Sequence, residues 1–241
     1  MIKSIESVQM DDFNANSNID FSSVLAAAVH DMKNSLCLLI QSIENLSDSI
    51  PKELDEAHCQ VANVHYEASR LNMNLVQMLS LYRAQLETLP TTVDEHFIAD
   101  LFEDVTGSNA LYSNQRKVSI DVNVDSELRW YLDGDLIYML INDVVVNALR
   151  YGTSRIRLSA KVENSHLVIS VEDDGPGYPE EMLINSNTEL SDFHVSQGRT
   201  GLGLFFARLI AAAHTRGKNC GTIALSNGGD LGGSVFVVNL P

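Results

Sequence analysis

The sequence of 241 residues lacks any long apolar run. No stretch approaches the roughly 18 consecutive apolar residues that a membrane-spanning helix needs. The opening residues have no apolar core and already carry acidic side chains, unlike a secretory signal peptide. We therefore expect a cytoplasmic protein that does not bind membranes.

Positive charge and cysteine are also scarce. The chain has 16 Lys and Arg against 32 Asp and Glu, for a formal net charge of −16. Nucleic acids and anionic membranes bind basic surfaces, so we expect neither as a partner. The three cysteines are scattered and odd in number, which favours reduced thiols over a disulfide framework. The composition suits a protein that binds a nucleotide through magnesium and meets a protein partner.

Residues 20–90 carry apolar side chains at alternating spacings of three and four, which predicts two helices packed along one seam. Pro51 separates them, and residues 1–19 form a polar arm. The apolar positions are Leu25, Val29, Met32, Leu36, Leu39, Ile43, Leu46 and Ile50, then Leu54, Ala57, Val61, Val64, Ala68, Leu71, Leu75, Met78 and Tyr82. Apolar residues also flank the seam, so an antiparallel hairpin forming a dimeric four-helix bundle is the economical arrangement. The alternative is a hairpin packed on its own C-terminal domain.

After residue 90 the pattern changes to alternating helices and strands, which predicts an α+β sandwich with helices on one face of a mixed sheet over residues 91–241. The predicted helices are 95–115, 136–151 and 201–214, and the predicted strands are 118–124, 128–132, 154–162, 167–172, 222–226 and 234–240. A loop is expected at 173–200.

A histidine within the first helix has polar neighbours suited to chemistry. His30 stands one step off the apolar seam, Asp31 follows it, and Asn34 lies one turn further on. The imidazole could accept a group, the carboxylate could hold its tautomer, and the amide could position a water. A lone histidine on a helix flank is more often structural, so this interpretation depends on the second half of the chain.

Polar side chains also interrupt the apolar helix at 136–151. Asp143 and Asn147 are four residues apart on one face, and Arg150 and Tyr151 follow at its end. Magnesium takes hard oxygen ligands such as an amide oxygen, and arginine can reach a phosphate. The alternative is an ordinary buried helix with polar ends.

Two glycine-containing stretches follow. In the first, a strand ends at Asp173, with Gly175 and Gly177 behind it; a carboxylate there can accept a hydrogen bond from an adenine amino group. Its alternative is a simple Asp-Gly turn. The second stretch opens directly into a helix, whose free N–H groups can bind phosphate. It consists of Arg199, Thr200, Gly201, Leu202 and Gly203.

In this order, the motifs resemble the core of a bacterial two-component sensor histidine kinase, over about residues 20–241. The resemblance consists of a phosphoacceptor box at His30, Asp31 and Asn34, an N box at Asp143 and Asn147, a first glycine box at Asp173, Gly175 and Gly177, and a second at Gly201, Leu202, Gly203 and Leu204. Phe193 resembles the phenylalanine box, and Gly232, Gly233 and Ser234 the last glycine motif.

The resemblance implies a dimerisation and histidine phosphotransfer hairpin followed by a Bergerat-type ATP-binding domain. His30 would be phosphorylated with Asp31 as its acid–base partner, and Asn34 would orient a water for dephosphorylating the partner. Asn147 would hold Mg²⁺ and Asp173 would select the adenine of ATP. The implied partners are a second copy of the chain, the receiver domain of a response regulator, and a separate sensory or regulatory protein.

Two positions depart from the family pattern. Ser35 stands where many members have proline, and Asp143 stands where Asn or Glu is usual. Three alternatives therefore stay open: a phosphotransfer or phosphatase protein of the same fold with weak use of ATP, a GHKL ATPase or Ser/Thr kinase with Asp143 as base, and a regulatory module with an inert ATP site.

Overall fold

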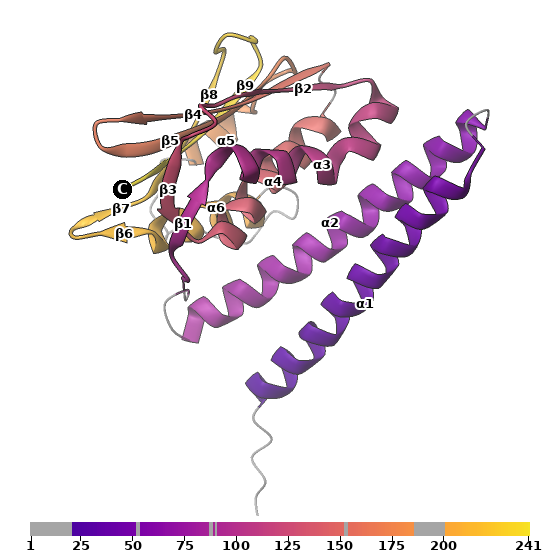
Figure 1. Ribbon diagram of the computed structural model, residues 1–241. Helices are drawn as coiled ribbons and strands as arrows, with labels where there is room; N and C mark the ends of the chain where they lie inside the picture. Colours follow the sequence, from indigo (N-terminus) through magenta and orange to yellow (C-terminus); the bar gives the residue numbers. More distant parts are fainter. Residues whose placement is uncertain (1–20, 52–53, 87–88, 90, 152–153, 186–200) are drawn as a thin grey trace, which may run out of the picture.

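The computed structural model describes residues 21–51, 54–86, 89, 91–151, 154–185 and 201–241. Within them, two long helices form a hairpin, and the remaining elements form a sheet covered by helices (Figure 1). The predicted fold class, a helical hairpin followed by an α/β sandwich, is confirmed. The arm at residues 1–19 lies outside the described residues.

The hairpin consists of α1 (Phe21–Ser49) and α2 (Asp55–Leu86), joined at Pro51. The predicted second helix begins later than expected, because Pro51 lies in the turn and its carbonyl accepts the Leu54 N–H at 3.0 Å. Ile43 of α1 is buried against Val61 and Ala68 of α2. Among the described residues, no helix is both long and apolar enough to cross a membrane.

Both helices of the hairpin also keep apolar side chains in water. These side chains recur every seven residues, so on each helix they lie on one line. Each is between 45% and 54% exposed, although the same helices bury Ile43 and Val61 almost completely. We call these lines the exposed stripes; they consist of Met32, Leu39 and Leu46 on α1, and of Val64 and Leu71 on α2. A single copy of the hairpin therefore leaves part of its predicted apolar face uncovered.

The central sheet has five strands in the order β2-β4-β5-β9-β8. Their bounds are β2 Ser119–Asn123, β4 Arg155–Glu163, β5 His166–Asp173, β8 Thr222–Asn227 and β9 Ser234–Leu240. Strand β2 is parallel to β4 and the other pairs are antiparallel, so the sheet is mixed, as predicted. Alternate residues of β5 are buried, because only one face of the sheet is covered.

Three helices pack on that face: α3 (Ile98–Arg116), α4 (Gly134–Arg150) and α6 (Gly201–Ala213) (Figure 1). Their apolar faces and the inner face of the sheet share one hydrophobic core, which includes Phe102, Ile141 and Phe206. We call this unit, from β1 to β9, the sheet domain.

Several short elements differ from the prediction. The helix expected from Glu95 begins at Ile98, because β1 (Asp94–Phe97) pairs with β3 (Arg129–Leu132) instead. The predicted loop at 173–200 contains a one-and-a-half-turn helix, α5 (Glu180–Asn185). A small hairpin of β6 (Thr215–Arg216) and β7 (Asn219–Cys220) follows α6.

The hairpin packs on the sheet domain through a contact between α2 and α3, which we call the seam. Tyr66 of α2 stacks on Tyr112 of α3, with ring centroids 4.3 Å apart and planes inclined by 17°. Arg116 donates from Nε and Nη2 to the Tyr112 hydroxyl, at 3.1 and 2.9 Å. Gln115 Nε2 donates to Cys59 Sγ at 3.0 Å. One side of the hairpin is therefore packed on its own C-terminal domain.

Some polar atoms near the seam are buried without a hydrogen-bond partner in the described part of the chain. Each such atom costs about 1–3 kcal/mol when it has lost its water. Four lie on α2 and one on α3: His58 Nε2, the Tyr66 hydroxyl, Arg70 Nε, Asn72 Oδ1 and Gln115 Oε1. Burial raises the pKa of Tyr66, although the nearby Arg150 guanidinium opposes this. The seam is therefore less well matched than the core of the sheet domain.

Candidate functional site

The first part of the candidate site is carried by α4, whose N-terminus is firmly anchored. The Asp133 side chain caps the helix by accepting the Leu136 N–H at 3.0 Å, and it accepts the Thr92 N–H at 2.7 Å. The Asp133 N–H donates to Nε2 of the buried His214, just after α6, at 3.0 Å. These bonds tie the start of α4 to the end of α6.

Asp143 and Asn147 lie one turn apart on α4, beside the N-terminus of α6. Nδ2 of Asn147 lies 3.4 Å from Oδ2 of Asp143. A Cβ atom added at Gly203, the third residue of α6, would stand only 2.7 Å from the same carboxylate oxygen. Position 203 is glycine because Asp143 fills the adjoining space. The N box and the second glycine box, 60 residues apart in sequence, are therefore in contact.

Asp173 ends β5 with a buried carboxylate whose hydrogen bonds are largely provided by the protein. Oδ1 accepts the N–H groups of Gly175 at 2.8 Å and of Ser234 at 3.1 Å, and the Ser234 hydroxyl donates to Oδ2. The Gly233 N–H donates to the Asp173 carbonyl at 2.9 Å. A Cβ atom at Gly233 would come within 2.5 Å of both the Asp173 carbonyl oxygen and the Gly175 nitrogen. The last glycine motif thus lets β9 approach the first glycine box.

Tyr178, just after the first glycine box, completes this part of the site. Oδ1 of Asn227 accepts the Tyr178 N–H at 2.7 Å, and Nδ2 of Asn227 donates to the Tyr178 carbonyl at 2.9 Å. Burial raises the pKa of Tyr178 to about 12. A hydrogen bond with Ser234 opposes the rise, whereas the carboxylates of Asp173 and Asp143 reinforce it. The phenol therefore lies near side chains from α4, β5 and β9.

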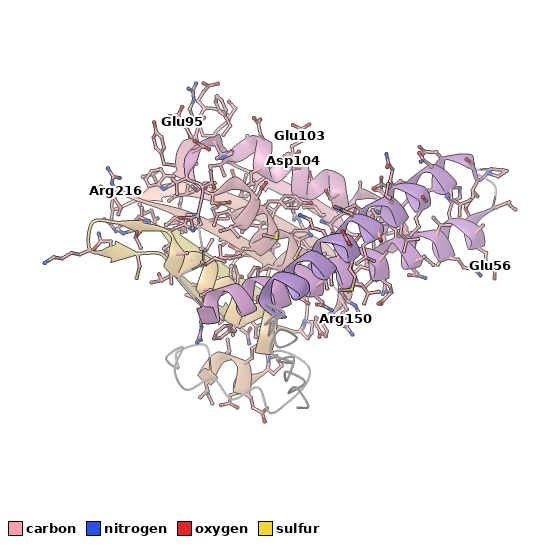
Figure 2. The ribbon with its side chains drawn as sticks, turned by 90° about the horizontal axis from the view of Figure 1, so that it is seen from below. Glu56, Glu95, Glu103, Asp104, Arg150 and Arg216 are labelled. Carbon is pink, nitrogen blue, oxygen red and sulfur yellow. The ribbon has the colours of Figure 1, made fainter. Side chains whose placement is uncertain are left out.

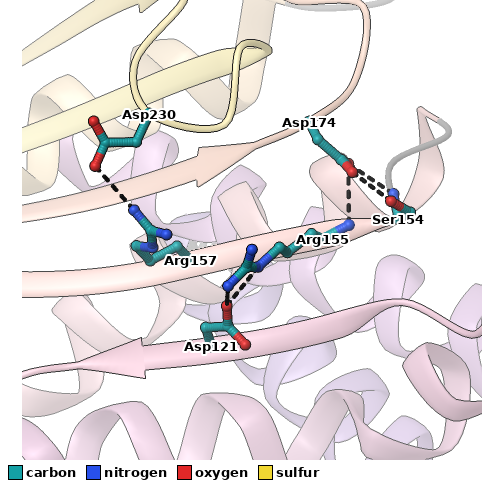
Figure 3. Close-up of polar contacts among 6 residues, drawn as sticks. All are labelled: Asp121, Ser154, Arg155, Arg157, Asp174 and Asp230. Carbon is teal, nitrogen blue, oxygen red and sulfur yellow. Dashed lines mark hydrogen bonds and ion pairs between the residues drawn. The ribbon is translucent and has the colours of Figure 1, made fainter.

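The side chain of the neighbouring Asp174 has a structural role. It accepts the N–H groups of Ser154 at 2.7 Å and Arg155 at 3.0 Å, as well as the Ser154 hydroxyl, and so holds the start of β4 (Figure 3). In the same region Arg157 pairs with Asp230 at 3.0 Å, which holds the loop leading into β9. Of the two adjacent carboxylates, only Asp173 belongs to the candidate site.

Arg150 and Tyr151 lie at the exposed end of α4. The Arg150 guanidinium carbon is 5.6 Å from the centroid of the Tyr151 ring, which is 55% exposed. Burial raises the pKa of Tyr66 and the charge of Arg150 opposes that rise, so this end of α4 lies near α2 (Figure 2). The predicted roles of Arg150 and Tyr151 in nucleotide binding stay predictions.

The predicted phosphoacceptor box lies on α1. The backbone of His30 is helical, and its side chain lies outside the described part of the structure. Asp31 and Asn34 are exposed on the same helix. Ser35 Oγ donates to the Asp31 carbonyl at 2.9 Å, and α1 continues unbroken past Ser35. The helix therefore has no break at the position where the family often has proline.

Several predicted residues fall outside the described residues. Arg199, Thr200 and Phe193 are among them. Gly201 and Leu202 form the first residues of α6, as predicted, but nothing is described of the Leu202 side chain.

Comparison with known proteins identifies the class to which this site belongs. Residues 132–241 match the family model described as "Histidine kinase-, DNA gyrase B-, and HSP90-like ATPase". The matched segment runs from the end of β3 to the C-terminus and includes the N box, both glycine boxes and Ser234. The sheet domain is therefore similar, over most of its length, to the ATPase domains of this class.

The relatives of the chain are histidine kinases and sensor proteins. Sensor protein SrrB of Staphylococcus aureus is 25% identical over 224 residues, which is 90% of this chain and 37% of the relative. The chain thus spans little more than a third of the curated relatives that it matches.

Solved structures share the fold. The histidine kinase AdeS of Acinetobacter baumannii matches with a TM-score of 0.57 and 20% identity, over 88% of this chain and 96% of AdeS. Full-length ShkA, solved with AMPPNP, matches with a TM-score of 0.60 and 18% identity, over 91% of this chain and 46% of ShkA. The chain therefore has the fold of histidine kinase cores, a helical hairpin followed by a mixed α/β sheet domain.

The sequence reasoning missed the part that Tyr178 and Asn227 play. Tyr178 was expected only within the loop at 173–200, although it directly follows the Asp-x-Gly-x-Gly pattern. Asn227 precedes two glycines at the end of β8, and this local sequence indicates only a turn. Its contact with Tyr178 joins residues 49 positions apart.

Proposed function

We propose that the chain is the kinase core of a two-component system. It phosphorylates His30 from ATP and passes the phosphoryl group to an aspartate on the receiver domain of a response regulator. One observation carries the proposal: an ATPase domain whose N box and glycine boxes converge is joined, in the same chain, to a helical hairpin with His30 on α1.

The nucleotide has a defined orientation in this proposal. Its adenine lies at the Asp173 end of the site, where the buried carboxylate accepts a hydrogen bond from the amino group. Its phosphates lie at the N-terminus of α6, where free N–H groups and the helix dipole favour negative charge. Gly201, Leu202 and Gly203 supply this N-terminus, and Arg150 with Arg199 adds positive charge for the phosphates.

The side chains around Asn147 fit a magnesium ion. Asn147 is exposed, and its amide nitrogen is turned to Asp143, which leaves the amide oxygen as a hard ligand of the kind that Mg²⁺ prefers. Magnesium, when bound, neutralises the phosphate oxygens. Asp143 fixes the orientation of the amide through this contact.

The chemistry at His30 is an in-line phosphoryl transfer. One ring nitrogen of the neutral imidazole attacks the γ-phosphorus with its lone pair, an N–P bond forms, and the bond to the β–γ bridging oxygen breaks to release ADP. Asp31 holds the proton on the other ring nitrogen, which keeps the attacking nitrogen unprotonated. The phosphoryl group then moves from His30 to a receiver aspartate.

The active form is a homodimer. The exposed stripes repeat every seven residues, and such lines are buried when two hairpins pack as a four-helix bundle. A second copy presents the same stripes by symmetry. Packing of α2 on α3 at the seam leaves the exposed stripes accessible. The hairpin can therefore pack on the ATPase domain and form a dimer at the same time.

Incubation with γ-labelled ATP and Mg²⁺ tests the proposal. We expect an acid-labile, alkali-stable label on the wild type that is lost in His30→Ala. The control is His166→Ala, because His166 lies on β5, at the opposite end of the strand from Asp173. A label that survives in His30→Ala, or the absence of ATP binding, would refute the proposal.

A second activity is supported by Asn34. It is exposed on an unbroken helix, one turn from His30, where an amide can orient a water toward a partner's acyl phosphate. We expect the chain to dephosphorylate a pre-phosphorylated receiver, and Asn34→Ala to slow this reaction while autophosphorylation continues. Equal loss of both reactions would show that Asn34 serves only the helix.

A further inference from the structure

Asn227, the last residue of β8, holds the backbone of Tyr178 with both polar atoms of its side-chain amide. Its Oδ1 accepts the Tyr178 N–H at 2.7 Å, and its Nδ2 donates to the Tyr178 carbonyl at 2.9 Å. We call this pair of hydrogen bonds the clamp. A Cβ atom at Gly177, where φ is +81°, would come as close as 2.8 Å to the Asn227 side chain. Glycine at position 177 therefore leaves room for the clamp.

The residue opposite Asn227 in the sheet holds the other end of the same segment. Asn227 pairs with Ser234 across β8 and β9, and the side chains of directly opposite residues lie on the same face of a sheet. The Ser234 N–H donates to Oδ1 of Asp173 at 3.1 Å, and the Ser234 hydroxyl donates to Oδ2. One cross-strand pair therefore holds both ends of residues 173–178, with Ser234 at the start and Asn227 at the end.

Between these two anchors the segment lies directly on β9. The Gly233 N–H donates to the Asp173 carbonyl at 2.9 Å, and a Cβ atom at Gly233 would come within 2.5 Å of the Gly175 nitrogen. The Gly175 N–H donates to Oδ1 of Asp173 at 2.8 Å. Of the three donors that orient this carboxylate, two thus belong to Ser234 and the third belongs to the segment that ends at the clamp.

The turn from β8 to β9 is itself fixed to the sheet. The Gly228 N–H donates to the Gly233 carbonyl at 2.8 Å, and Oε2 of Glu172 accepts the Asp230 N–H at 3.1 Å. Nη1 of Arg157 pairs with Oδ2 of Asp230 at 3.0 Å (Figure 3). These bonds tie the turn to β4 and β5, so Asn227 is anchored independently of the segment that it holds.

We infer that Asn227 is a positioning residue for the base of the nucleotide. It acts through the protein: the clamp keeps the Gly175 N–H on Asp173 and so sets the direction of the carboxylate that the 6-amino group of the base meets. Hydrogen bonds weaken steeply when donor and acceptor are misaligned, so a small rotation of this carboxylate matters. The inference rests on the proposed function, because it requires a base at Asp173.

The test compares Asn227→Ala with the wild type by calorimetric titration of the full chain. The ligands are ATP and purine riboside triphosphate, which has hydrogen in place of the 6-amino group. A hydrogen bond to a charged group corresponds to about 12- to 160-fold in affinity, so the wild type should prefer ATP at least about tenfold. In Asn227→Ala we expect ATP to bind about tenfold more weakly, and purine riboside triphosphate to bind within about twofold of wild type.

The ratio of the two affinities separates positioning from folding, because partial unfolding weakens the binding of both nucleotides equally. Asn123→Ala is the matched control and should keep the wild-type ratio, since Asn123 is exposed on β2, at the other edge of the same sheet. Equal losses for both nucleotides in Asn227→Ala would show a purely structural role and overturn the inference. An unchanged affinity for ATP would overturn it as well.

Amide hydrogen exchange on the wild type keeps the inference testable if Asn227→Ala fails to fold. The clamp should slow exchange of the Tyr178 N–H about 5- to 150-fold relative to an unstructured chain, because opening it breaks two neutral hydrogen bonds. ATP should slow this exchange further, because nucleotide binding and the clamp stabilise each other reciprocally. Exchange at the rate of an unstructured chain, or exchange that ATP leaves unchanged, would contradict the inference.

The proposed function and the inference fail in different ways. A wild type that binds neither nucleotide refutes the proposed function, and the inference with it. A wild type that binds both nucleotides equally has no contact between Asp173 and the 6-amino group, and the inference is wrong. If the wild type prefers ATP and Asn227→Ala keeps the same preference, only the role of Asn227 is refuted.

Discussion

The sheet domain and the hairpin bury their apolar residues in different ways. The largest fully buried side chains among the described residues all belong to the sheet domain, and they include Phe102 in α3, Ile169 in β5 and Phe206 in α6. The hairpin buries Ile43, Val61 and Ala68, but its exposed stripes remain about half in water. The sheet domain can therefore fold around its own core, whereas the hairpin depends on a second surface.

The two regions also differ in how their polar groups are matched. Around Asp173, backbone N–H groups and a hydroxyl hold the carboxylate in place. Near the seam, polar atoms such as the Tyr66 hydroxyl are buried without a partner among the described residues. A matched network fixes one geometry, whereas an unmatched contact is easily released. The candidate site is therefore held in one geometry, and the joint between the two regions is weak.

Gly233→Ala should break the sheet domain's site and leave the hairpin intact. The added Cβ would overlap backbone atoms of Asp173 and Gly175, which no side-chain rotation can relieve. Such overpacking costs about 1–3 kcal/mol, so we expect ATP affinity to fall by up to about 100-fold in calorimetric titration. Gly107→Ala on α3 is the control, since a Cβ there meets nothing within 4 Å. Unchanged affinity in Gly233→Ala would contradict the close approach.

Leu39→Lys should have the opposite effect: it should weaken the dimer and leave the site of the sheet domain intact. Complete burial of a leucine side chain contributes about 1.5–3 kcal/mol. Leu39 is 48% exposed in a single copy and a twofold dimer contains it twice, so its burial in the dimer also contributes about 1.5–3 kcal/mol. We expect the dimer to weaken about 100-fold or less in analytical ultracentrifugation, with ATP affinity within about twofold of wild type. Gln41→Lys, exposed on α1 but outside the stripe, should dimerise normally. Equal effects of the two lysines would argue against the stripes as the interface.

Gly203→Ala should lower the activity of the sheet domain without lowering its stability. The new methyl group would displace the Asp143 carboxylate, and with it the amide of Asn147. We expect autophosphorylation to slow about tenfold, the effect of a group displaced by a fraction of an ångström. Alanine favours a helix over glycine by about 1 kcal/mol, so the melting temperature should stay equal or rise. A lower melting temperature would mean that the helix itself is disturbed.

Tyr66→Phe should strengthen the seam slightly. It removes a buried hydroxyl without a described partner and keeps the ring stacked on Tyr112, so we expect a gain of about 1 kcal/mol in the free energy of unfolding. Burial raises the pKa of Tyr66, so the wild type should lose stability as the pH rises above about 10, where the unfolded phenol ionises. The Tyr66→Phe variant should lose less stability over the same pH range. Tyr131→Phe, 66% exposed, is the control for both measurements.

Local patterns predicted most of the fold and the order of the site. The three-four spacing around Ile43 and Val61 correctly predicted the hairpin, because that spacing depends only on helix geometry. The Asp173 and Gly203 stretches were singled out by their local sequence, a carboxylate at the end of a strand and a glycine run that opens directly into a helix. In each case the physical cause acts over a few residues.

The failures involve partners distant in sequence. Residues 95–97 were predicted as the start of a helix, and only the pairing of Asp94–Phe97 with β3, more than 30 residues later, makes them part of a strand. The clamp of Asn227 on Tyr178 likewise depends on how the end of β8 lies near the segment that follows β5, with β9 between the two strands. Neither partner can be identified from local spacing alone.

The position of the seam has a consequence for the path of the phosphoryl group. The end of α4 lies near Tyr66, whose neighbour His65 lies 3.3 Å from Glu44 on α1. His30 stands 14 residues before Glu44 on the same helix, a rise of about 21 Å. Donor and acceptor in one protomer are thus several helical turns apart along the hairpin. The proposed phosphorylation of His30 therefore requires a large displacement, either travel of the domain along its own hairpin or delivery from the other protomer, and the poorly matched seam favours such travel.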